Sequence, residues 1–429
     1  MLKPYLTLLF SVLCLAVVPV RAAVITLTAG SDLQQAVERA QAGDVLHLAS
    51  GRYRGPVVID KPLTLAGPSD RSAVIDGGGR GRSVSITAPD SVLRHLTVTG
   101  SGIRLDTMDA GIFLDKTAHR AVVEENNISG NAFGVYVWGA NDAVVRANRI
   151  VGDSSLRVNE RGNGVNIWNA AGTEVSDNLI SQGRDGIFSN ASTRNTYKNN
   201  HFSKLRYAVH YMYTNDSEIS GNISDGNQIG YALMFSERLK IRNNIAVNSS
   251  AQGMMLNYAN HSDISGNVVD KAEKCVFIYN ANHNRITDNY FGGCGIGIHF
   301  TAAAEGNTIH SNAFVSNQNQ IKYVSTRYAD WGESGRGNYW SDNSAFDLDG
   351  DGIADTAYRP NGITDQILWR APAARLLMNS PAISMVKWAQ AQFPALLPGG
   401  ITDSRPLMLM PHSPTWQRYQ TYKQNRQAA

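Results

Sequence analysis

Four residues with soft donor atoms recur at near-regular intervals in the middle of the chain: His210, Met212, Met234 and Met255. If this segment forms repeated strands in one register, alternation places all four side chains on one face. Met212 and Met234 then become neighbours on adjacent strands, about 4.8 Å apart. Imidazole and thioether groups are ligands that Cu(I) prefers. The pattern therefore predicts a candidate copper site, and the alternative is an adaptable Met-rich contact patch that binds no metal.

A second cluster is acidic and lies further along the chain, in residues 338–355. Carboxylates at alternate positions followed by glycine resemble the first half of a calcium loop, in which hard oxygen ligands converge around a tight turn. The twelfth position of such a loop is Tyr358, where an EF-hand requires glutamate. We predict a partial calcium loop, and the alternative is an acid-rich turn held by local hydrogen bonds. The candidate ligands are Asp347, Asp349, Asp351 and Asp355.

The N-terminal residues have the features of a secretory signal peptide. Lys3 precedes a mostly apolar run over residues 6–20, and small residues follow at a plausible cleavage point. The run is short for a membrane span of about 20 residues, although a permanent N-terminal anchor is the alternative. Export would place Cys275 and Cys294 in an oxidising compartment. A disulfide, a pair of free thiols and a soft-metal site all remain open for these two cysteines.

The elements that position these residues are indicated by a repeated phrase, an asparagine followed two residues later by an apolar residue. The asparagines are 22 or 23 residues apart, except for one step of 30 that contains an insertion at 152–162. Such a period, with short alternating strands and Asn/Gly turns, predicts a solenoid of stacked coils. The fold class is therefore all-β, a right-handed parallel β-helix of the pectin-lyase-like type. The repeated residues are Asn126, Asn148, Asn178, Asn200, Asn222, Asn244, Asn267, Asn289 and Asn312.

Proline placement sets the domain boundaries, because proline removes a ladder hydrogen bond from a central strand. No proline lies between Asp90 and Arg359, and eight of the 14 prolines lie from Pro360 onward. Ser31 and Asp32 can start a short helix that caps the open end of the first coil. We predict a signal peptide (1–22), a β-helix with an N-terminal cap helix (23–325), an Asp-rich loop segment (326–370) and a Pro/Trp-rich docking tail (371–429).

The tail contains a segment with apolar residues at helical spacing, residues 380–397. This segment is a candidate docking helix, and the alternative is a helix packed on its own coil. Trp369, Trp388 and Trp416 could lie at a membrane interface or in a small local core.

Strand alternation also predicts two outward columns on one face of the coil. In residues 134–138, Val135 and Val137 point inward, so Tyr136 and Trp138 point outward. The same register in every coil gives columns of aromatic, Met and His side chains, and an exposed apolar stripe of this kind marks a binding surface. The alternative is that the tail or an inter-coil loop covers the stripe. The candidate partner-binding residues are Tyr136, Trp138, Trp168, Phe188, Phe277 and Tyr279.

Charge and residue patterns argue against several function classes. Two of the 39 Lys and Arg residues lie in the leader, which leaves 37 against 36 Asp and Glu, a balance that argues against nucleic acid. Hydrolysis of a glycosidic bond requires two flanking carboxylates, and the outward columns offer only Asp115. We therefore expect a protein that is not an enzyme. The alternative is a secreted carbohydrate-binding β-helix, or a polysaccharide lyase or epimerase.

The repeats, the tail and the block GNYWSDNSAFDLDGDGIADTAYRP (337–360) together resemble the NosD family. The resemblance implies a non-enzymatic periplasmic protein that works with a membrane permease and a cytoplasmic ATPase in an ABC-type assembly. It also implies a role in building the copper–sulfide centre of nitrous oxide reductase, with copper supplied by a chaperone lipoprotein. The resemblance supplies no metal-ligand motif, so the predicted copper cluster depends on the repeat register alone.

Overall fold

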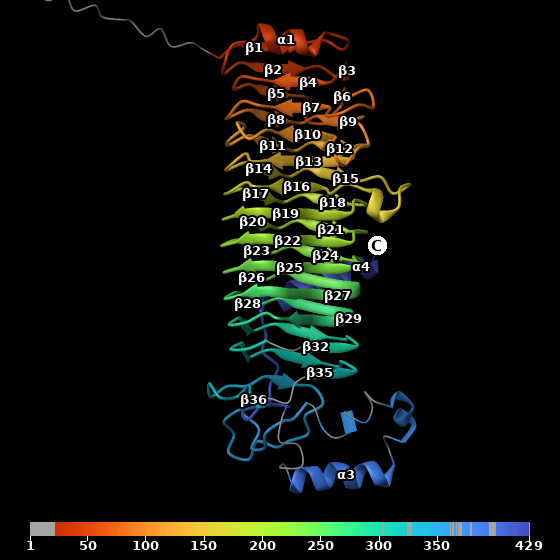
Figure 1. Ribbon diagram of the computed structural model, residues 1–429, viewed down its shortest axis with the longest axis vertical. Helices are drawn as coiled ribbons and strands as arrows, with labels where there is room; N and C mark the ends of the chain where they lie inside the picture. The colour runs from red at the N-terminus through yellow and green to blue at the C-terminus, as the bar shows by residue number, and fades with distance from the viewer. Residues whose placement is uncertain are drawn as a thin grey trace, which may run out of the picture.

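The computed structural model describes residues 22–301, 304–323, 328–360, 362, 364–365, 367, 371–377, 380–393 and 400–428. The chain winds into a tall stack of parallel strands, with successive coils running from the N-terminal to the C-terminal end (Figure 1). Each regular coil contributes one strand to each of three faces, which confirms the predicted right-handed parallel β-helix. The segment assigned to the signal peptide lies outside the described residues, apart from Ala22.

The first face is a 13-stranded parallel sheet. Its strands are β1 (Val24–Leu27), β2 (Val45–Leu48), β5 (Thr64–Ala66), β8 (Val92–Arg94), β11 (Val122–Glu124), β14 (Val144–Arg146), β17 (Glu174–Ser176), β20 (Thr196–Lys198), β23 (Glu218–Ser220), β26 (Lys240–Arg242), β28 (Asp263–Ser265), β30 (Arg285–Thr287) and β33 (Thr308–His310).

The second and third faces together form a 23-stranded sheet, because the long strands β27 (Ile245–Asn260) and β29 (Val268–Tyr279) run across both. The other strands of the second face are β3 (Gly51–Arg54), β6 (Ala73–Asp76), β9 (Thr97–Thr99), β12 (Asn127–Ser129), β15 (Arg149–Val151), β18 (Leu179–Ser181), β21 (His201–Ser203), β24 (Ile223–Asp225), β31 (Tyr290–Gly292), β34 (Ala313–Val315) and β37 (Tyr339–Trp340). Those of the third face are β4 (Val57–Ile59), β7 (Val84–Ile86), β10 (Ala110–Leu114), β13 (Phe133–Trp138), β16 (Val165–Trp168), β19 (Asp185–Thr193), β22 (Tyr207–Asn215), β25 (Ile229–Glu237), β32 (Ile296–Phe300) and β35 (Asn319–Tyr323).

The repeated asparagines form a continuous ladder inside the turn between the first and second faces. All nine are buried, and each side-chain amide donates to the carboxamide oxygen of the next rung at 2.9–3.1 Å. The ladder continues to Asn338 at the start of β37. The turn therefore satisfies its buried polar groups by repetition, which explains the regular spacing of asparagine in the sequence.

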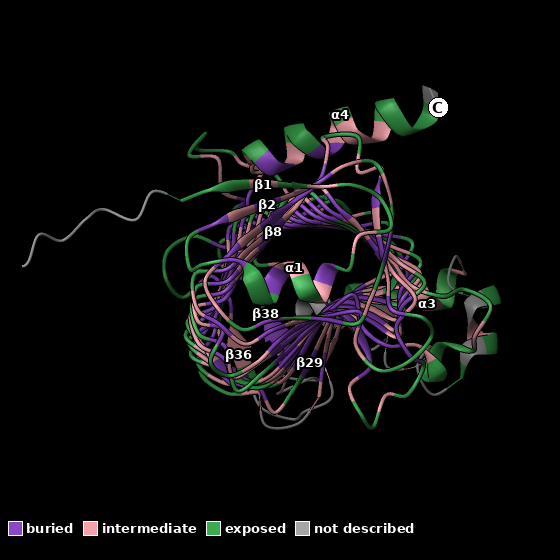
Figure 2. Ribbon diagram, turned by 90° about the horizontal axis from the view of Figure 1, so that it is seen from above, coloured by how far each residue is buried: buried purple, intermediate pink, exposed green. Residues whose placement is uncertain are grey.

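Both ends of the coil are covered. The predicted cap helix is α1 (Leu33–Arg39), where Asp32 accepts a hydrogen bond from the backbone N–H of Gln35, and Leu33 and Val37 are buried on the first coil. Figure 2 shows α1 lying over the open end. At the other end, the buried Asp403 accepts hydrogen bonds from the amides of Asn338 and from the indole of Trp340.

Asp403 comes after β38 (Gly400–Thr402), which pairs with β36 (Tyr328–Asp330). The block 337–360 therefore supplies the last rung of the ladder, Asn338. Asp403, from the tail, accepts the hydrogen bonds of this last rung. A disulfide joins Cys275 and Cys294, with their Cα atoms 5.7 Å apart and both residues buried. Of the three states left open for these cysteines, the structure has the disulfide.

The tail separates into parts that lie in different places. A 3-10 helix, η2 (Pro372–Leu377), precedes α3 (Pro381–Gln392), and α3 lies beyond the last coils (Figure 1). The C-terminal helix α4 (Pro414–Ala428) instead returns to the second face, where Trp416 and Tyr419 pack on Ile245 and Val268. Figure 2 shows α4 on the outside of the coil.

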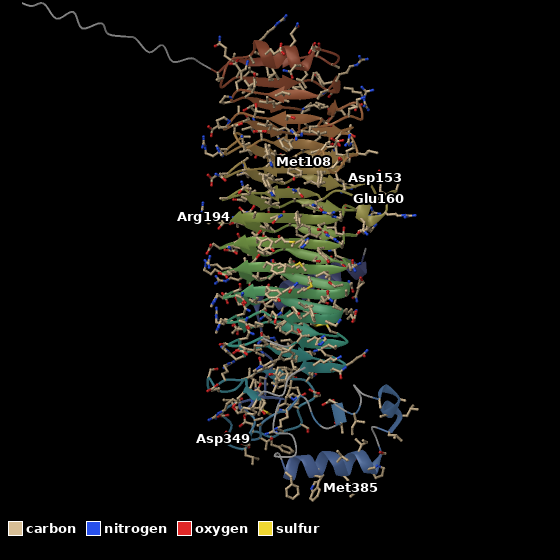
Figure 3. The ribbon with its side chains drawn as sticks, in the orientation of Figure 1. Met108, Asp153, Glu160, Arg194, Asp349 and Met385 are labelled. Carbon is tan, nitrogen blue, oxygen red and sulfur yellow. A yellow bond between two sulfur atoms is a disulfide. The ribbon has the colours of Figure 1, made fainter. Side chains whose placement is uncertain are left out.

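Of the three tryptophans considered for a membrane interface, Trp416 lies in this local core, Trp388 on α3 is 64% exposed, and Trp369 falls outside the described residues. No helix in the described part of the chain combines the length and apolar composition needed to cross a bilayer. The insertion at 152–162 projects from the coil and includes the short 3-10 helix η1 (Val158–Glu160), as the labelled Asp153 and Glu160 show in Figure 3.

Candidate copper and partner-binding face

The third face carries the two outward columns that the sequence predicts. Strand register pairs successive members of the first column across adjacent coils: Phe113, Tyr136, Asn166, Phe188, His210, Ala232, Met255, Phe277 and His299. The second column is paired in the same way over Trp138, Trp168, Asn190, Met212, Met234, Asn257 and Tyr279. The repeat phase therefore placed these paired residues on the expected face.

The N-terminal part of the face is covered, which corrects the expectation that Tyr136 is exposed. Tyr136 is only 9% exposed, because it packs with Phe113 and Phe133 beneath an inter-coil segment that contributes Leu105 and Met108. Figure 3 labels Met108 of this segment. The guanidinium of Arg82 lies 3.3 Å from the centre of the Phe113 ring, a further contact of the covered patch. In these coils an inter-coil segment therefore covers the stripe, as the alternative interpretation predicts.

The other predicted partner-binding residues are more open. Trp138 and Trp168 stack with ring centroids 6.0 Å apart, and Trp168 is 39% exposed. Phe188 and Phe277 are half-buried in the first column, whereas Tyr279 in the second column is 40% exposed. The exposed part of the face therefore follows the second column.

His210 lies in a buried polar network on this face. Its Nδ1 is 3.1 Å from a carboxylate oxygen of Asp185, and the guanidinium of Arg206 donates to both oxygens of Asp185 at 2.8 and 2.7 Å. Burial alone would raise the pKa of Asp185, but the hydrogen bonds from His210 and Arg206 hold it below its ordinary value. Asp185 is fully buried and His210 is 7% exposed. The other ring nitrogen of His210, Nε2, is buried with no hydrogen-bond partner in the described structure.

The three predicted methionine ligands lie around this histidine on adjoining coils. Met212 follows His210 by two residues on β22, and its register partner is Met234 on β25. Met255 on β27 pairs with Ala232, which is itself the register partner of His210. Met255 and Ala232 are buried in a small cluster against which Met234 packs. The structure therefore brings all four residues to one region of the third face.

An exposed aromatic ladder borders the methionines and was not predicted. Tyr213, Phe235 and Tyr258 stack on consecutive coils with ring centroids 5.3 and 5.1 Å apart, and they are 55%, 36% and 41% exposed. Simple alternation points these residues inward. Their positive φ angles of 50°, 48° and 52° reverse that direction at the strand end. The available sequence signal was aromatic residues recurring one position after the second column at the repeat spacing.

His299 is the last residue of the first column, and it lies near lysines, whereas His210 lies beside a carboxylate. Burial, with the positive charges of Lys322 and Lys274, lowers the pKa of His299 to about 4. Its ring contacts Phe277 edge-on, with centroids 5.3 Å apart, and Nδ1 is buried without a partner in the described residues. His299 is therefore a neutral imidazole at pH 7.

The acidic loop brings together three of its four predicted ligands. Carboxylate oxygens of Asp347, Asp349 and Asp351 lie within 4.8 Å of one another. Asp355 is not part of this group, because its carboxylate instead accepts a hydrogen bond from the backbone N–H of Leu348. The clustered carboxylates also accept local backbone hydrogen bonds, including two to Asp347 at 2.7 and 2.9 Å. Both the calcium loop and the hydrogen-bonded turn are compatible with this geometry.

Solved structures with a similar fold include polysaccharide-modifying enzymes. The A-module of mannuronan C-5 epimerase AlgE6 from Azotobacter vinelandii matches with a TM-score of 0.52 at 14% identity, covering 72% of this chain and 92% of the other. A mannuronic acid specific family 6 polysaccharide lyase from human gut microbiota gives 0.50 at 13% identity, covering 75% and 88%. Identities this low establish the shared β-helix fold and no shared activity.

Sequence relatives are far more similar over most of the chain. The probable ABC transporter binding protein NosD of Stutzerimonas stutzeri is 38% identical over 379 residues, covering 85% of this chain and 86% of the relative. Its counterpart in Pseudomonas aeruginosa is 39% identical over 378 residues, covering 85% and 88%. Residues 146–345 match the family model described as periplasmic copper-binding protein (NosD). This chain therefore belongs to the NosD family.

Proposed function

We propose that this protein is a non-enzymatic periplasmic scaffold that assists copper-centre assembly in nitrous oxide reductase, together with an ABC-type permease and its cytoplasmic ATPase. The observation that carries the proposal is the third face, where an exposed aromatic ladder borders His210 and three methionines. The description of the family as copper-binding supports a copper cargo. The names of the relatives support association with an ABC transporter. A chaperone lipoprotein that delivers copper would be a further partner.

The donor set of the third face fits a soft metal cargo. Nε2 of His210 has no protein partner in the described structure, and Met212, Met234 and Met255 offer thioethers on the same and the next two coils. Imidazole and thioether donors carry no negative charge and suit Cu(I) better than hard divalent cations. The protein's role would be to hold copper between neutral donors while a partner occupies the exposed rings.

The arrangement of the rings argues against a sugar-binding groove. Phe235 lies between Tyr213 and Tyr258 at interplanar angles of 23° and 11°, so both of its faces are taken by neighbouring rings. Trp138 and Trp168 are stacked at 13°. Sugars stack on open ring faces, whereas a ladder presents mainly edges, which suit apolar protein contacts. Asp185, the carboxylate beside His210, is buried and ion-paired, so it does not supply the open acid that hydrolysis requires.

The membrane partner has a separate candidate contact in the tail. Met385 and Trp388 on α3 are 71% and 64% exposed, and Phe393 directly after the helix is 62% exposed. Met385 is labelled in Figure 3, on the helix beyond the last coils. Large apolar side chains gathered on an exposed helix mark a docking surface. We assign this helix to the permease and the third face to the reductase.

Co-purification tests the proposal. The mature chain, carrying an affinity tag, is produced together with the permease, the ATPase and metal-free nitrous oxide reductase, and is recovered in mild detergent. The proposal expects both the transporter and the reductase to be retained. The double variant Trp168→Ser and Tyr258→Ser should lose the reductase and keep the transporter. Retention of neither partner, with binding of an acidic oligosaccharide by the purified chain, would replace the proposal with the carbohydrate alternative.

The acidic loop carries a separate, structural proposal. Ca²⁺ held by Asp347, Asp349 and Asp351 would pin the loop at the C-terminal end of the coil. Calcium titration followed by calorimetry tests this, because a hydrogen-bonded turn without metal affinity would give no binding heat. The variant Asp349→Asn should weaken any binding that is observed, since it removes one of the three carboxylates.

A further inference from the structure

The buried network around His210 fixes which of its two ring nitrogens carries hydrogen. Asp185 is ion-paired with Arg206 through both carboxylate oxygens and lies 3.1 Å from His210 Nδ1. An ionised carboxylate only accepts hydrogen bonds, so Nδ1 is the protonated nitrogen. In the neutral ring, the lone pair is then on Nε2.

The fold provides no hydrogen-bond donor for the lone pair on Nε2 among the described residues. Nε2 is buried and has no hydrogen-bond partner among the described residues, although His210 is only 7% exposed. The ring is instead enclosed by aromatic groups, with Phe188 and Tyr207 centroids 4.9 and 5.0 Å away. Buried polar atoms in native proteins nearly always have a partner, so an orphan acceptor points to a ligand.

The neighbouring donors identify the kind of ligand. Met212 lies two residues beyond His210 on the same side of β22, about 6.6 Å along the strand. Met234 is the register partner of Met212, and the next member of that column is Asn257, whose buried carboxamide oxygen also lacks a partner in the described structure. One imidazole nitrogen and two thioethers form a neutral, soft donor set.

We propose that Nε2 of His210 and the thioethers of Met212 and Met234 form a Cu(I) site, in which Asp185 is the positioning residue that fixes the tautomer of His210. Arg206 holds Asp185 in place by its paired hydrogen bonds. A carboxylate on the remote nitrogen of a metal-binding imidazole orients the ring and raises its basicity. The inference takes from the proposed function only that copper is the cargo.

A purely structural role for the network makes a different prediction. If Asp185, Arg206 and His210 only stabilise the third face, their replacement would change the unfolding of the chain and leave its metal affinity alone. Readouts of metal ligation and metal affinity therefore separate the two roles, whereas loss of stability alone does not.

The first measurement uses the unaltered chain, so it does not depend on a variant that folds. Histidine-selective ¹⁵N labelling of the metal-free mature chain reports the tautomer of His210, assigned with His210→Gln. We expect hydrogen on Nδ1 and no hydrogen on Nε2. The ¹⁵N resonance of Nε2 should shift when Cu(I) is added together with a reductant that keeps the copper as Cu(I). Hydrogen on Nε2, or no shift of that nitrogen on adding Cu(I), overturns the proposal.

The second measurement is the Cu(I) dissociation constant from competition with a chromophoric Cu(I) chelator. Asp185→Asn should weaken Cu(I) binding by about 10–100-fold, the usual effect of removing such a supporting carboxylate. The matched control is Asp263→Asn, which removes an ion-paired carboxylate from the first face and should leave the affinity unchanged. Met212→Leu with Met234→Leu keeps side-chain volume but should remove the thioether sulfur signal from the copper X-ray absorption spectrum.

These results also separate the site from the proposed function. A folded Asp185→Asn chain with wild-type Cu(I) affinity overturns the positioning role, even if the chain still captures the reductase. Wild-type Cu(I) affinity and sulfur ligation in the double Met→Leu variant overturn the ligand set. If all the expected copper results are obtained but neither membrane partner nor reductase is captured, the site stands and the proposed assembly role fails.

Discussion

The asparagine ladder makes the most quantitative prediction of the structure, and Asn222 in its middle is the best residue to change. The Asn222 side chain accepts hydrogen bonds from the backbone N–H and the side-chain amide of Asn200, at 2.9 and 3.0 Å. It donates to the carbonyl of Tyr197 at 2.9 Å and to Asn244 at 3.0 Å. The residue is fully buried, so water cannot replace these partners.

The cost of Asn222→Ala follows from the groups that it leaves unpaired. Asn200 keeps a side-chain bond to Val175, and Asn244 still accepts from the backbone N–H at position 222. The backbone N–H of Asn200 loses its hydrogen-bond partner, whereas the carbonyl of Tyr197 loses one donor but stays in the parallel ladder with β23. An orphaned buried polar group costs about 1–3 kcal/mol. The one orphaned N–H therefore predicts a loss of about 1–3 kcal/mol in the free energy of unfolding.

Urea unfolding followed by circular dichroism measures this loss, and hydrogen exchange locates it. Solenoid coils interact mainly with their neighbours, so faster exchange should concentrate in the coils on either side of residue 222. The matched control is Asn190→Ala, because that half-buried side chain makes no hydrogen bond in the described structure and should change stability by less than about 0.5 kcal/mol. The reasoning is refuted if the two variants unfold alike, or if exchange increases equally along the whole coil.

Three further predictions concern the disulfide, the third face and the tail. Replacing Cys275 and Cys294 with serine should cost about 3 kcal/mol in urea unfolding, since the bridge closes a loop with a sequence separation of 19, and an unchanged midpoint would contradict this. Because the pKa of folded His299 is about 4, below its ordinary value, its stabilising contribution is present above pH 6.5 and is lost as pH falls toward 4. His299→Gln should therefore flatten the dependence of stability on pH over this range, and an unchanged slope would exclude the role. Met385→Ser with Trp388→Ser should leave thermal unfolding nearly unchanged, because both side chains are exposed, but should abolish capture of the permease; retained capture would contradict the docking role.

The fold could be predicted from the sequence because its repeat is enforced by buried hydrogen bonds. Each asparagine rung fixes the phase of one coil, so counting from Asn222 or Asn244 places residues on the third face without knowledge of the structure. The same count brought Met212 beside Met234 across adjacent coils. A periodic constraint of this kind is local and visible in one sequence, which is why the columns were predictable.

The exposure of the face could not be predicted in the same way. Tyr136 is buried because a non-repetitive segment folds over it, and repeat phase contains no information about such a segment. Tyr213 and Phe235 escaped notice because positive φ angles turn them out of the strand alternation. Asp185 was overlooked because its partners, Arg206 and His210, lie on the next coil, 21 and 25 residues away in sequence. These are tertiary contacts that a pattern along one chain does not specify.

The most direct test of the central claim is the affinity of the purified mature chain for metal-free nitrous oxide reductase, measured by biolayer interferometry with and without Cu(I). The account predicts saturable binding that is weakened at least tenfold by Trp168→Ser with Tyr258→Ser. It also predicts that Leu179→Ser, at a 50% exposed position on the second face, leaves the affinity within twofold of wild type. Absence of binding in both copper states, or equal binding by the wild-type chain and the Trp168/Tyr258 double variant, would contradict the account.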